Sequence, residues 1–348
     1  MMKLAREYNV QLSATNPSRD LKCDIPIWYH AHTISAARKL YKTKTAKCLR
    51  KKHNIRLVRD ALTLLENVPD NHTPRINCTC ETCNLLRNTL KCPHPSECID
   101  TTSSLLKHIH PRWNPTTDSP QTDTQEAPTD LDENERAFLK NNETSSLKNA
   151  IKIFGTATEP IDPPTTLQYN APDTTEYTSV FTDGACTNNG NDNAAAGLGI
   201  WYGEEDPRNL SMRVPIKQQS NQTGELMAIL VVAMNHPPNE NLRIISDSRY
   251  VIDGLTKHLE KWEARDWTDT QNGNLFKCIT AWLRWRPGKT ILKWVKGHSG
   301  IKGNEEADRL AGEGTFKPMP PDPMPLNPPP NLTTNGATLA YLEQKDLY

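Results

Sequence analysis

Four acidic residues in the C-terminal half of the chain are the strongest candidates for chemistry. Asp183 and Asp247 each close a short apolar strand, in the stretches "VFTDG" and "RIISDS". Glu225 directly precedes the apolar run "LMAILVVAM". Asp308 follows His298 by ten residues, where a glycine-rich loop leads into an acidic helix. Solvation does not explain an acid that ends an apolar strand, and ligand sites in open α/β sheets favour that end.

Taken singly, each acid has an ordinary explanation, and Asp308 suits a helix N-terminus electrostatically. Taken together, they repel one another, because each pair at about 4 Å costs roughly 4 kcal/mol at an effective dielectric near 20. Such a cluster persists only with cations or with some groups protonated. Hard oxygen ligands select Mg²⁺ or Mn²⁺, and two such ions can clamp a phosphodiester.

The elements that would position these acids follow from the hydrophobic pattern of residues 175–316. Alternating and buried runs predict strands, and capped periodic runs predict helices. Asn304 is expected to be the N-cap of the last helix. The order is β-β-β-α-β-α-α-β-α, which predicts one mixed sheet with helices packed on it.

The composition divides the chain into four parts. Residues 1–112 are basic and Cys-bearing, with ten Lys and Arg and no acid between residues 38 and 59. Residues 113–174 are an acidic, Thr- and Pro-rich linker with a possible helix from Asp130 to Phe154. Residues 175–316 carry the periodic signals, and residues 317–348 are a Pro-rich tail expected to be extended and solvated.

The basic N-terminal part predicts a polyanionic partner. The first residues lack the apolar core of a secretory signal, and the longest apolar run is far below the roughly 20 residues of a membrane helix. We therefore expect an intracellular protein of the nucleus or cytoplasm, with no membrane partner and no small-molecule cofactor. Its nine Cys are then thiols or metal ligands rather than disulfides.

Four segments resemble the successive motifs of the type 1 ribonuclease H family. They are "FTDGACTNNG", "SNQTGELMAI", "SDSRYVIDGL" and "WVKGHSGIKGNEEADRLA", in the order of the family, within residues 176–316. The resemblance implies an α/β ribonuclease H-like fold with a five-stranded mixed sheet flanked by helices, beside a mostly helical or irregular N-terminal region. It also implies an endonuclease that cleaves the RNA strand of RNA–DNA hybrids with two Mg²⁺, for which Mn²⁺ can substitute, leaving 5′-phosphate and 3′-hydroxyl ends.

The resemblance assigns roles to individual residues. Asp183, Glu225, Asp247 and Asp308 match the metal-binding carboxylates, with Asp183 bridging both ions. His298 matches a mobile loop His that assists proton movement or product release. The residues expected to contact the nucleic acid are Cys186, Asn188, Asn189, Ser220, Asn221, Gln222 and Trp262.

The side-chain amides among these residues suit recognition of a 2′-hydroxyl, which both donates and accepts hydrogen bonds. Their ordinary alternative is that Asn221 is only an N-cap and Asn189 only a turn residue. The chain departs from the family on the DNA side, where Gln218 stands for an Arg and His258 for an aromatic residue of some members. The segment "EKWEARDW" around Trp262 is not basic, which predicts weaker phosphate neutralisation there.

The segment "CTCETCNLLRNTLKCPHPSEC" is the other candidate site. It predicts a structural Zn²⁺ site because Zn²⁺ takes four Cys or His ligands in short paired spacings. The candidate ligands are Cys78, Cys80, Cys83, Cys92, His94 and Cys98. The alternative is a merely Cys-rich loop. A Cys-rich region ahead of such a domain also resembles fungal mobile-element open reading frames.

The sequence therefore predicts an active ribonuclease H with an N-terminal nucleic-acid-binding region. Two alternatives remain: the ribonuclease H portion of a retroelement-derived protein that acts with a reverse transcriptase, and a non-catalytic hybrid-binding protein. The second would require a lost carboxylate, and none of the four is missing.

Overall fold

The computed structural model describes residues 7–117, 131–140, 143–155, 176–321, 324, 326–329, 332–338 and 341. Most of the predicted linker and parts of the Pro-rich tail lie outside these residues. The chain divides into two compact units. Unit 1 comprises residues 1–122 and 143–151, and unit 2 comprises residues 123–142 and 152–348.

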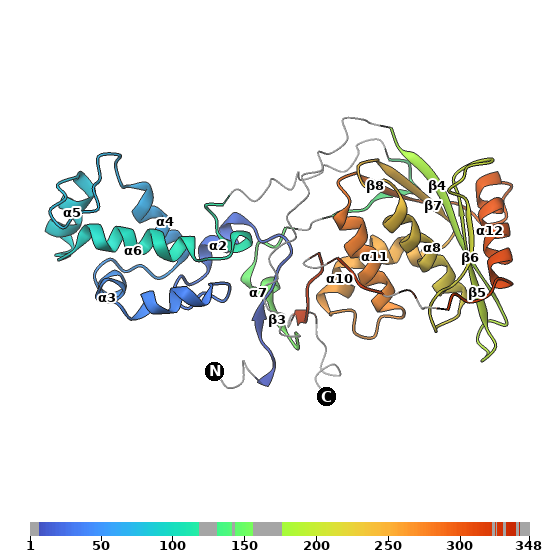
Figure 1. Ribbon diagram of the computed structural model, residues 1–348, viewed down its shortest axis with the longest axis horizontal. Coiled ribbons are helices and arrows are strands. Elements are labelled where there is room, and N and C mark those ends of the chain that lie inside the picture. The colour runs from blue at the N-terminus through green and yellow to red at the C-terminus, as the bar shows by residue number, and fades with distance from the viewer. Residues whose placement is uncertain are drawn as a thin grey trace. The chain divides into compact units, whose positions relative to one another are not determined.

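Unit 1 is mostly helical (Figure 1). Its longest helix, α6, begins at Pro95, which suits a first helical position because its missing N–H needs no partner there. Helix α6 contacts α3, α4 and α5 through a core that includes Leu49, Leu105 and Trp113. The elements are β1 (Gln11–Leu12), α2 (Arg19–Asp24), η1 (Ser35–Lys42), α3 (Lys44–Lys51), α4 (Val58–Glu66), α5 (Glu81–Thr89), α6 (Pro95–Lys107), η2 (Pro111–Trp113) and α7 (Leu147–Ala150).

Unit 2 contains a six-stranded mixed sheet in the order β2-β8-β7-β4-β5-β6. Strands β4, β7 and β8 are parallel to one another, whereas β5, β6 and β2 pair antiparallel with their neighbours. The strands are β2 (Glu135–Ala137), β4 (Thr178–Thr187), β5 (Ala195–Trp201), β6 (Leu210–Arg213), β7 (Leu242–Ser246) and β8 (Thr290–Trp294).

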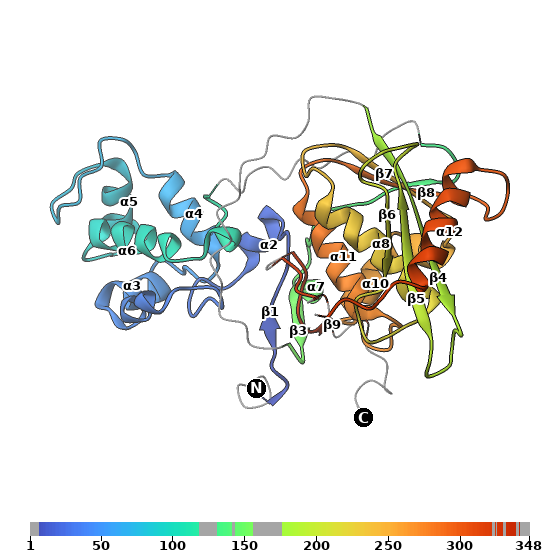
Figure 2. The same ribbon diagram turned by 45° about the vertical axis from the view of Figure 1, so that its right-hand side comes forward.

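Helices cover both faces of this sheet, as Figures 1 and 2 show from two directions. Helix α12 lies on one face against β4, β5 and β6, and α8 lies on the other with α11 packed beside it. The side chains of α8 from Leu226 to Ala233 are buried, so this helix forms the centre of the core. The helices are α8 (Asn221–Asn235), α9 (Arg249–Leu255), α10 (Leu259–Ala264), α11 (Gly273–Trp285) and α12 (Lys302–Thr315).

The observed ribonuclease H-like architecture confirms the predicted fold class, but the predicted five-stranded sheet is wrong by one strand. The sixth strand, β2, comes from the segment expected to be linker, where a helix from Asp130 to Phe154 was predicted. Asp130 itself lies outside the described residues, and the described part contains β2, α7 and β3 (Ile151–Ile153). The buried carboxylate of Glu135 stabilises β2 in the sheet, because it pairs with Arg243 of β7 and Lys293 of β8.

Two further details differ from the sequence prediction. The stretch "DSRYVIDGLTKHL" predicts one helix from Asp247 to Leu259, but α9 ends at Leu255 and a separate helix, α10, begins at Leu259. Part of the described Pro-rich tail packs on unit 2, because β9 (Ala337–Thr338) pairs with β3 and Met324 donates its N–H to the carbonyl of Pro215, whereas Lys317, Pro318 and Met319 are exposed.

Among the described residues, no helix combines the length and the apolar character that crossing a bilayer would require.

Candidate active site

Asp183 lies on β4, pressed against helix α8 by the glycine that follows it. A Cβ atom on Gly184 would come 2.1 Å from the backbone nitrogen of Glu225, so no larger residue fits between strand and helix. The N–H of Gly184 donates to Oδ1 of Asp183 over 2.7 Å and orients the carboxylate. The "DG" pair therefore brings the Asp183 side chain to the helix that carries Glu225.

Glu225 lies in the first turns of α8, whose start is set by a cap. Ser220 is the N-cap, and its hydroxyl accepts from the N–H of Thr223 over 3.2 Å. The hydroxyl oxygen of Thr223 accepts in turn from the N–H of Ser220. The Glu225 side chain is 7 % exposed. A nearly buried carboxylate needs a compensating partner, because isolated charges are costly to bury.

Asp247 follows β7 directly, and the parallel register that pairs Phe181 with Ile245 brings it beside Asp183. Asp183 was expected to end its strand, but β4 continues to Thr187 and pairs with β5 there, so only the parallel pairing with β7 ends near Asp183.

Asn304 donates its side-chain amide to Oδ2 of Asp247 over 3.2 Å, and Trp294 donates its ring N–H to the backbone carbonyl of Asp247 over 2.9 Å. Asn304 was predicted to be the N-cap of α12, but this is wrong because that helix already begins at Lys302. Its buried side chain positions Asp247 instead.

Asp183, Glu225 and Asp247 converge, with one carboxylate oxygen from each lying within 4.8 Å of the others. Burial, then the charges of Asp247 and Asp308, raise the pKa of Asp183 to about 7, although the Gly184 N–H lowers it. Burial and the charges of Asp183 and Asp247 raise the pKa of Glu225 well above its usual range. Three carboxylates so placed are not all ionised at neutral pH unless a cation joins them.

Asp308 does not join this group of three, although it lies close enough for its charge to raise the pKa of Asp183 and of Glu225. Its helix, α12, reaches the sheet because β5 carries glycine there. A Cβ on Gly199 would lie 2.0 Å from the carbonyl oxygen of Ala307, the residue before Asp308. Asp308 is half-buried at the margin of the site.

His298 lies in the loop between β8 and α12 and is exposed, with a left-handed φ of 49°. The same loop passes Asp247 so closely that a Cβ on Gly297 would lie 2.6 Å from its Oδ2. The loop thus borders the carboxylate group, but among the described residues the His298 side chain makes no hydrogen bond or ion pair with the three acids.

The predicted amide contacts lie together where the β4–β5 turn meets the start of α8. The side-chain oxygen of Asn189 accepts from the N–H of Asn221 over 3.3 Å, and Asn188 and Asn189 are exposed in the turn. Gln222 accepts from the side chain of Asn272 over 3.4 Å. Asn221 is the first helical residue rather than the cap.

Asn272 is a polar residue of this surface that the sequence analysis missed. It precedes α11 with a left-handed φ of 56° and also contacts Gln218 and Tyr250. The Asn–Gly pair at residues 272–273 could have indicated it, because Asn and Gly are the residues that adopt this backbone conformation most readily.

The remaining predicted substrate contacts are half-buried. Ser220 is occupied by the helix cap, and the thiol of Cys186 donates to the carbonyl of Thr187 over 3.4 Å. The ring of Trp262 lies 5.0 Å from that of Phe276, so it packs at the margin of the core.

The predicted zinc ligands of unit 1 separate into two groups. Cys78, Cys80 and Cys83 lie with His72, whereas Cys92 and Cys98 lie with Cys48 and His53. His94 belongs to neither group. The sequence analysis missed Cys48, His53 and His72 because all three lie outside the Cys-rich segment that begins at Cys78, and Cys48 lies 44 residues before Cys92.

The carboxylate group fits divalent cations such as Mg²⁺ on the chemistry of its donors. All three side chains offer hard oxygen ligands. Burial and the repulsion among the acids raise the pKa of Asp183 and of Glu225, and a cation bound here would remove that repulsion.

Comparison with known proteins supports these observations. Residues 175–316 match the RNase H family model. The chain is 37% identical over 139 residues to Ribonuclease H of Schizosaccharomyces pombe, covering 39% of this chain and 52% of that protein. It is 35% identical over 144 residues to Ribonuclease H1 of Mus musculus, covering 40% of this chain and 50% of that protein. The chain thus spans about half the length of these curated relatives.

Bacterial relatives are covered almost completely. Ribonuclease H of Novosphingobium aromaticivorans is 32% identical over 153 residues, which are 40% of this chain and 98% of that protein. Among solved structures, LC9-RNase H1, described as a type 1 RNase H with the type 2 active-site motif, aligns with 25% identity and a TM-score of 0.32, over 39% of this chain and 71% of that one.

Proposed function

Because the chain belongs to the ribonuclease H family, we propose that unit 2 hydrolyses the RNA strand of RNA–DNA hybrids as an endonuclease, leaving 5′-phosphate and 3′-hydroxyl ends. The observation that carries this proposal is the convergence of Asp183, Glu225 and Asp247 within 4.8 Å, where the parallel pairing of β4 and β7 ends. No structural need accounts for three converging acids, two of which, Asp183 and Glu225, have a pKa raised by burial and by the charges of their neighbours.

Asp183, Glu225 and Asp247, with Asp308 at the margin, would hold two Mg²⁺ ions, for which Mn²⁺ can substitute. Bound there, the ions would supply activation of the attacking water and neutralisation of the leaving oxygen. Asp183 is the proposed ligand to both ions, because its carboxylate lies within 4.8 Å of those of Asp247, after β7, and Glu225, on α8. Asn304 holds Asp247 in place through its amide, so Asp247 keeps its orientation as the substrate enters and leaves.

His298 is proposed to move a proton or to help the product leave. Its loop borders Asp247, and its exposure lets the side chain move without disturbing the core. Glycines flank it at positions 297 and 300, and Gly300 has a left-handed φ of 81°. A group that acts in this way assists turnover, and water can partly replace it.

Choice of RNA is proposed to rest on the amides of Asn189, Asn221 and Gln222. Such groups both donate and accept, as a 2′-hydroxyl does. Asn272 supports Gln222 through its side chain and helps to hold that amide in place. A DNA duplex offers these amides no 2′-hydroxyl, so the proposal includes discrimination against DNA–DNA duplexes.

The test is a cleavage assay on an end-labelled RNA–DNA hybrid with Mg²⁺, using the full chain. We expect internal cuts in the RNA strand and none in a DNA–DNA duplex of the same sequence. Asp183→Asn should reduce the rate to below a tenth of that of the wild type while binding of the hybrid persists.

Two outcomes would overturn the proposal. Tight hybrid binding without cleavage in Mg²⁺ or Mn²⁺ would indicate a non-catalytic hybrid-binding protein. Cleavage that appears only after addition of a reverse transcriptase would indicate a domain that acts as part of a retroelement complex. Comparable rates on hybrid and DNA duplex would refute the recognition scheme alone.

A further inference from the structure

Unit 1 contains two compact groups of Cys and His side chains that the ribonuclease H proposal does not use. The first, here called the α3–α6 cluster, comprises Cys48, His53, Cys92 and Cys98. The second, the α5 cluster, comprises His72, Cys78, Cys80 and Cys83. In each cluster, one ligand atom from every residue lies within 4.8 Å of the other three.

The distances in both clusters fit the edges of a tetrahedron around one ion. With Zn–S near 2.3 Å and Zn–N near 2.0–2.1 Å, tetrahedral geometry separates two sulfurs by about 3.8 Å and a sulfur from a nitrogen by about 3.6 Å. The Sγ atom of Cys92 lies 3.7 Å from that of Cys48 and 3.7 Å from that of Cys98.

The α5 cluster shows the same agreement around its histidine. Nδ1 of His72 lies 3.4 Å from Sγ of Cys80, and 3.5 Å from Sγ of Cys78 and of Cys83. A disulfide would need an S–S separation of about 2.05 Å, and all nine cysteines are free. The thiols of both clusters therefore surround a common centre rather than pair with one another.

The histidines give a second, independent observation. Within the described part of the chain, both ring nitrogens of His53 are buried without a hydrogen-bond partner, although one of them faces the three thiols of its cluster. A buried imidazole without a partner is costly, because it loses its hydrogen bonds to water and gains none. A metal ion at the centre of the cluster would satisfy the nitrogen that faces it.

Backbone N–H groups point at the sulfurs, as expected around thiolates rather than thiols. The N–H of Thr73 donates to Sγ of Cys78 over 3.4 Å, and the N–H of Cys83 donates to Sγ of Cys80 over 3.4 Å. Such donors orient metal-bound sulfur and offset part of its negative charge. The N–H of Cys83 belongs to the first turn of α5, for which Cys80 is the N-cap, whereas Thr73 lies in the segment before this helix.

We propose that unit 1 binds two Zn²⁺ ions, one in each cluster, each held by three Cys and one His. Four protein ligands close the coordination sphere, which marks both sites as structural. An iron–sulfur cluster fits less well, because its inorganic sulfides separate the protein ligands more widely than a single ion does.

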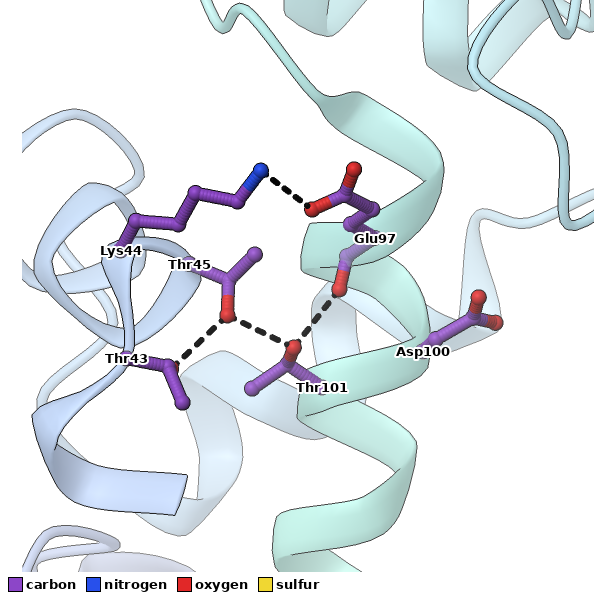
Figure 3. A pocket seen from close by; sticks show the side chains of 6 residues that line it. All are labelled: Thr43, Lys44, Thr45, Glu97, Asp100 and Thr101. Atoms are coloured by element: carbon purple, nitrogen blue, oxygen red, sulfur yellow. Dashed lines mark hydrogen bonds and ion pairs between the residues drawn. The ribbon is translucent and has the colours of Figure 1, made fainter. Parts of the chain in front are cut away.

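The two ions would stabilise different parts of unit 1. The ion of the α3–α6 cluster would join Cys48 on α3 to Cys98 on α6. Figure 3 shows the neighbouring polar contacts between these helices, in which Lys44 pairs with Glu97 over 3.4 Å and Thr101 donates to Thr45 over 3.0 Å. These contacts are exposed or half-buried, so they stabilise the junction less than a closed metal site would.

The ion of the α5 cluster would order the segment between α4 and α5. Residues 68–80 contain no helix or strand, and His72 and Cys78 lie in this segment. Few apolar side chains of the segment are buried, and Ile76 is 70 % exposed. Zn²⁺ coordination can supply the folding energy that such a segment lacks.

Metal content of the full chain tests the proposal. Protein from zinc-supplied cells is exchanged into Mg²⁺ buffer, which keeps zinc off the carboxylates, and is measured by native mass spectrometry and elemental analysis. We expect two zinc ions in the wild type, one in Cys48→Ser, one in Cys83→Ser and none in the double variant. The matched controls His94→Gln and Cys23→Ser should keep two, since neither residue belongs to a cluster.

A wild-type measurement covers the case in which a serine variant unfolds all of unit 1. Thiol alkylation is mapped by mass spectrometry with and without a chelator. The six cluster thiols should become reactive only after chelation, whereas Cys278, which is buried in the core of unit 2, should not change. Equal reactivity with and without chelator, fewer than two zinc ions in the wild type, or loss of zinc from His94→Gln would overturn the proposal.

Discussion

Replacing Asp183 with asparagine should stabilise unit 2 at alkaline pH in the absence of divalent cations. Burial and the nearby acids raise the pKa of Asp183 to about 7 from 3.8. At a pH between 3.8 and about 7, Asp183 holds a proton in the folded protein that it has released in the unfolded chain. Stability from this group is therefore present at low pH and is lost as the pH rises through 7. Asparagine is neutral at every pH and removes this loss.

The size of the effect follows from the shift. Between pH 5.5 and the folded pKa of about 7, one group changes the free energy of unfolding by about 2 kcal/mol, at about 1.4 kcal/mol for each pH unit. The difference in stability between Asp183→Asn and the wild type should therefore grow by about 2 kcal/mol from pH 5.5 to pH 8. Removing the charge also relieves Glu225, which adds to the difference in the same direction.

Urea unfolding followed by tryptophan fluorescence measures this difference. Six of the eight Trp lie in residues 201–294, so the signal reports mainly on unit 2. Buffers passed over a chelating resin exclude added cations without stripping tightly held ions from unit 1. Comparing the stability of Asp183→Asn with that of the wild type at each pH cancels the contributions of groups that both proteins share. One such group is His236, whose pKa is lowered to about 4 by burial.

Two controls sharpen this result. Asp192→Asn replaces an exposed acid and should leave the pH dependence unchanged. Added Mg²⁺ should stabilise the wild type more than Asp183→Asn, because binding to the folded state alone adds to its stability. A stability difference that stays constant from pH 5.5 to pH 8 would refute the assignment of a raised pKa to Asp183.

Two further changes test how the site is assembled and how it turns over. Gly184→Ala should destabilise unit 2 by about 3 kcal/mol and abolish cleavage, because the new Cβ would meet backbone atoms of α8 that cannot move away. The control Gly312→Ala, which has open space around it, should be neutral or stabilising in the same urea unfolding experiment. His298→Ala should slow steady-state turnover by about 10²-fold, less than Asp183→Asn does, and single-turnover rates should be spared if the His acts in product release. A His298→Ala enzyme as inactive as Asp183→Asn would refute both roles.

Local patterns predicted most of unit 2. Strands β4 and β7 are visible in the sequence because apolar runs lead up to Asp183 and Asp247, and parallel pairing places these two acids side by side. The sequence did not reveal that β4 continues past Asp183 to Thr187, where its partner is β5. The cap of α8 at Ser220 was equally visible, since a hydroxyl precedes a long apolar run.

What the sequence did not reveal depends on distant partners. Strand β2 is three residues long and forms only because Glu135 and its neighbours meet β8, more than 150 residues later. The partner of Asn304 is Asp247, which no local pattern indicates. Likewise, the α3–α6 cluster takes Cys48 and His53 from α3 and the residues that follow it, so spacing within one short segment predicted a different ligand set.

Strand β2 also has a consequence for where the catalytic unit can be cut. The family match begins at residue 175, yet β8 is paired on one side by β7 and on the other by residues 135–137. A fragment that begins at residue 175 would leave the backbone of β8 as an open sheet edge and would leave Arg243 and Lys293 without the carboxylate of Glu135. Open edges recruit strands from other molecules, so such a fragment would tend to self-associate, whereas one that begins near residue 131 would carry its own edge protection.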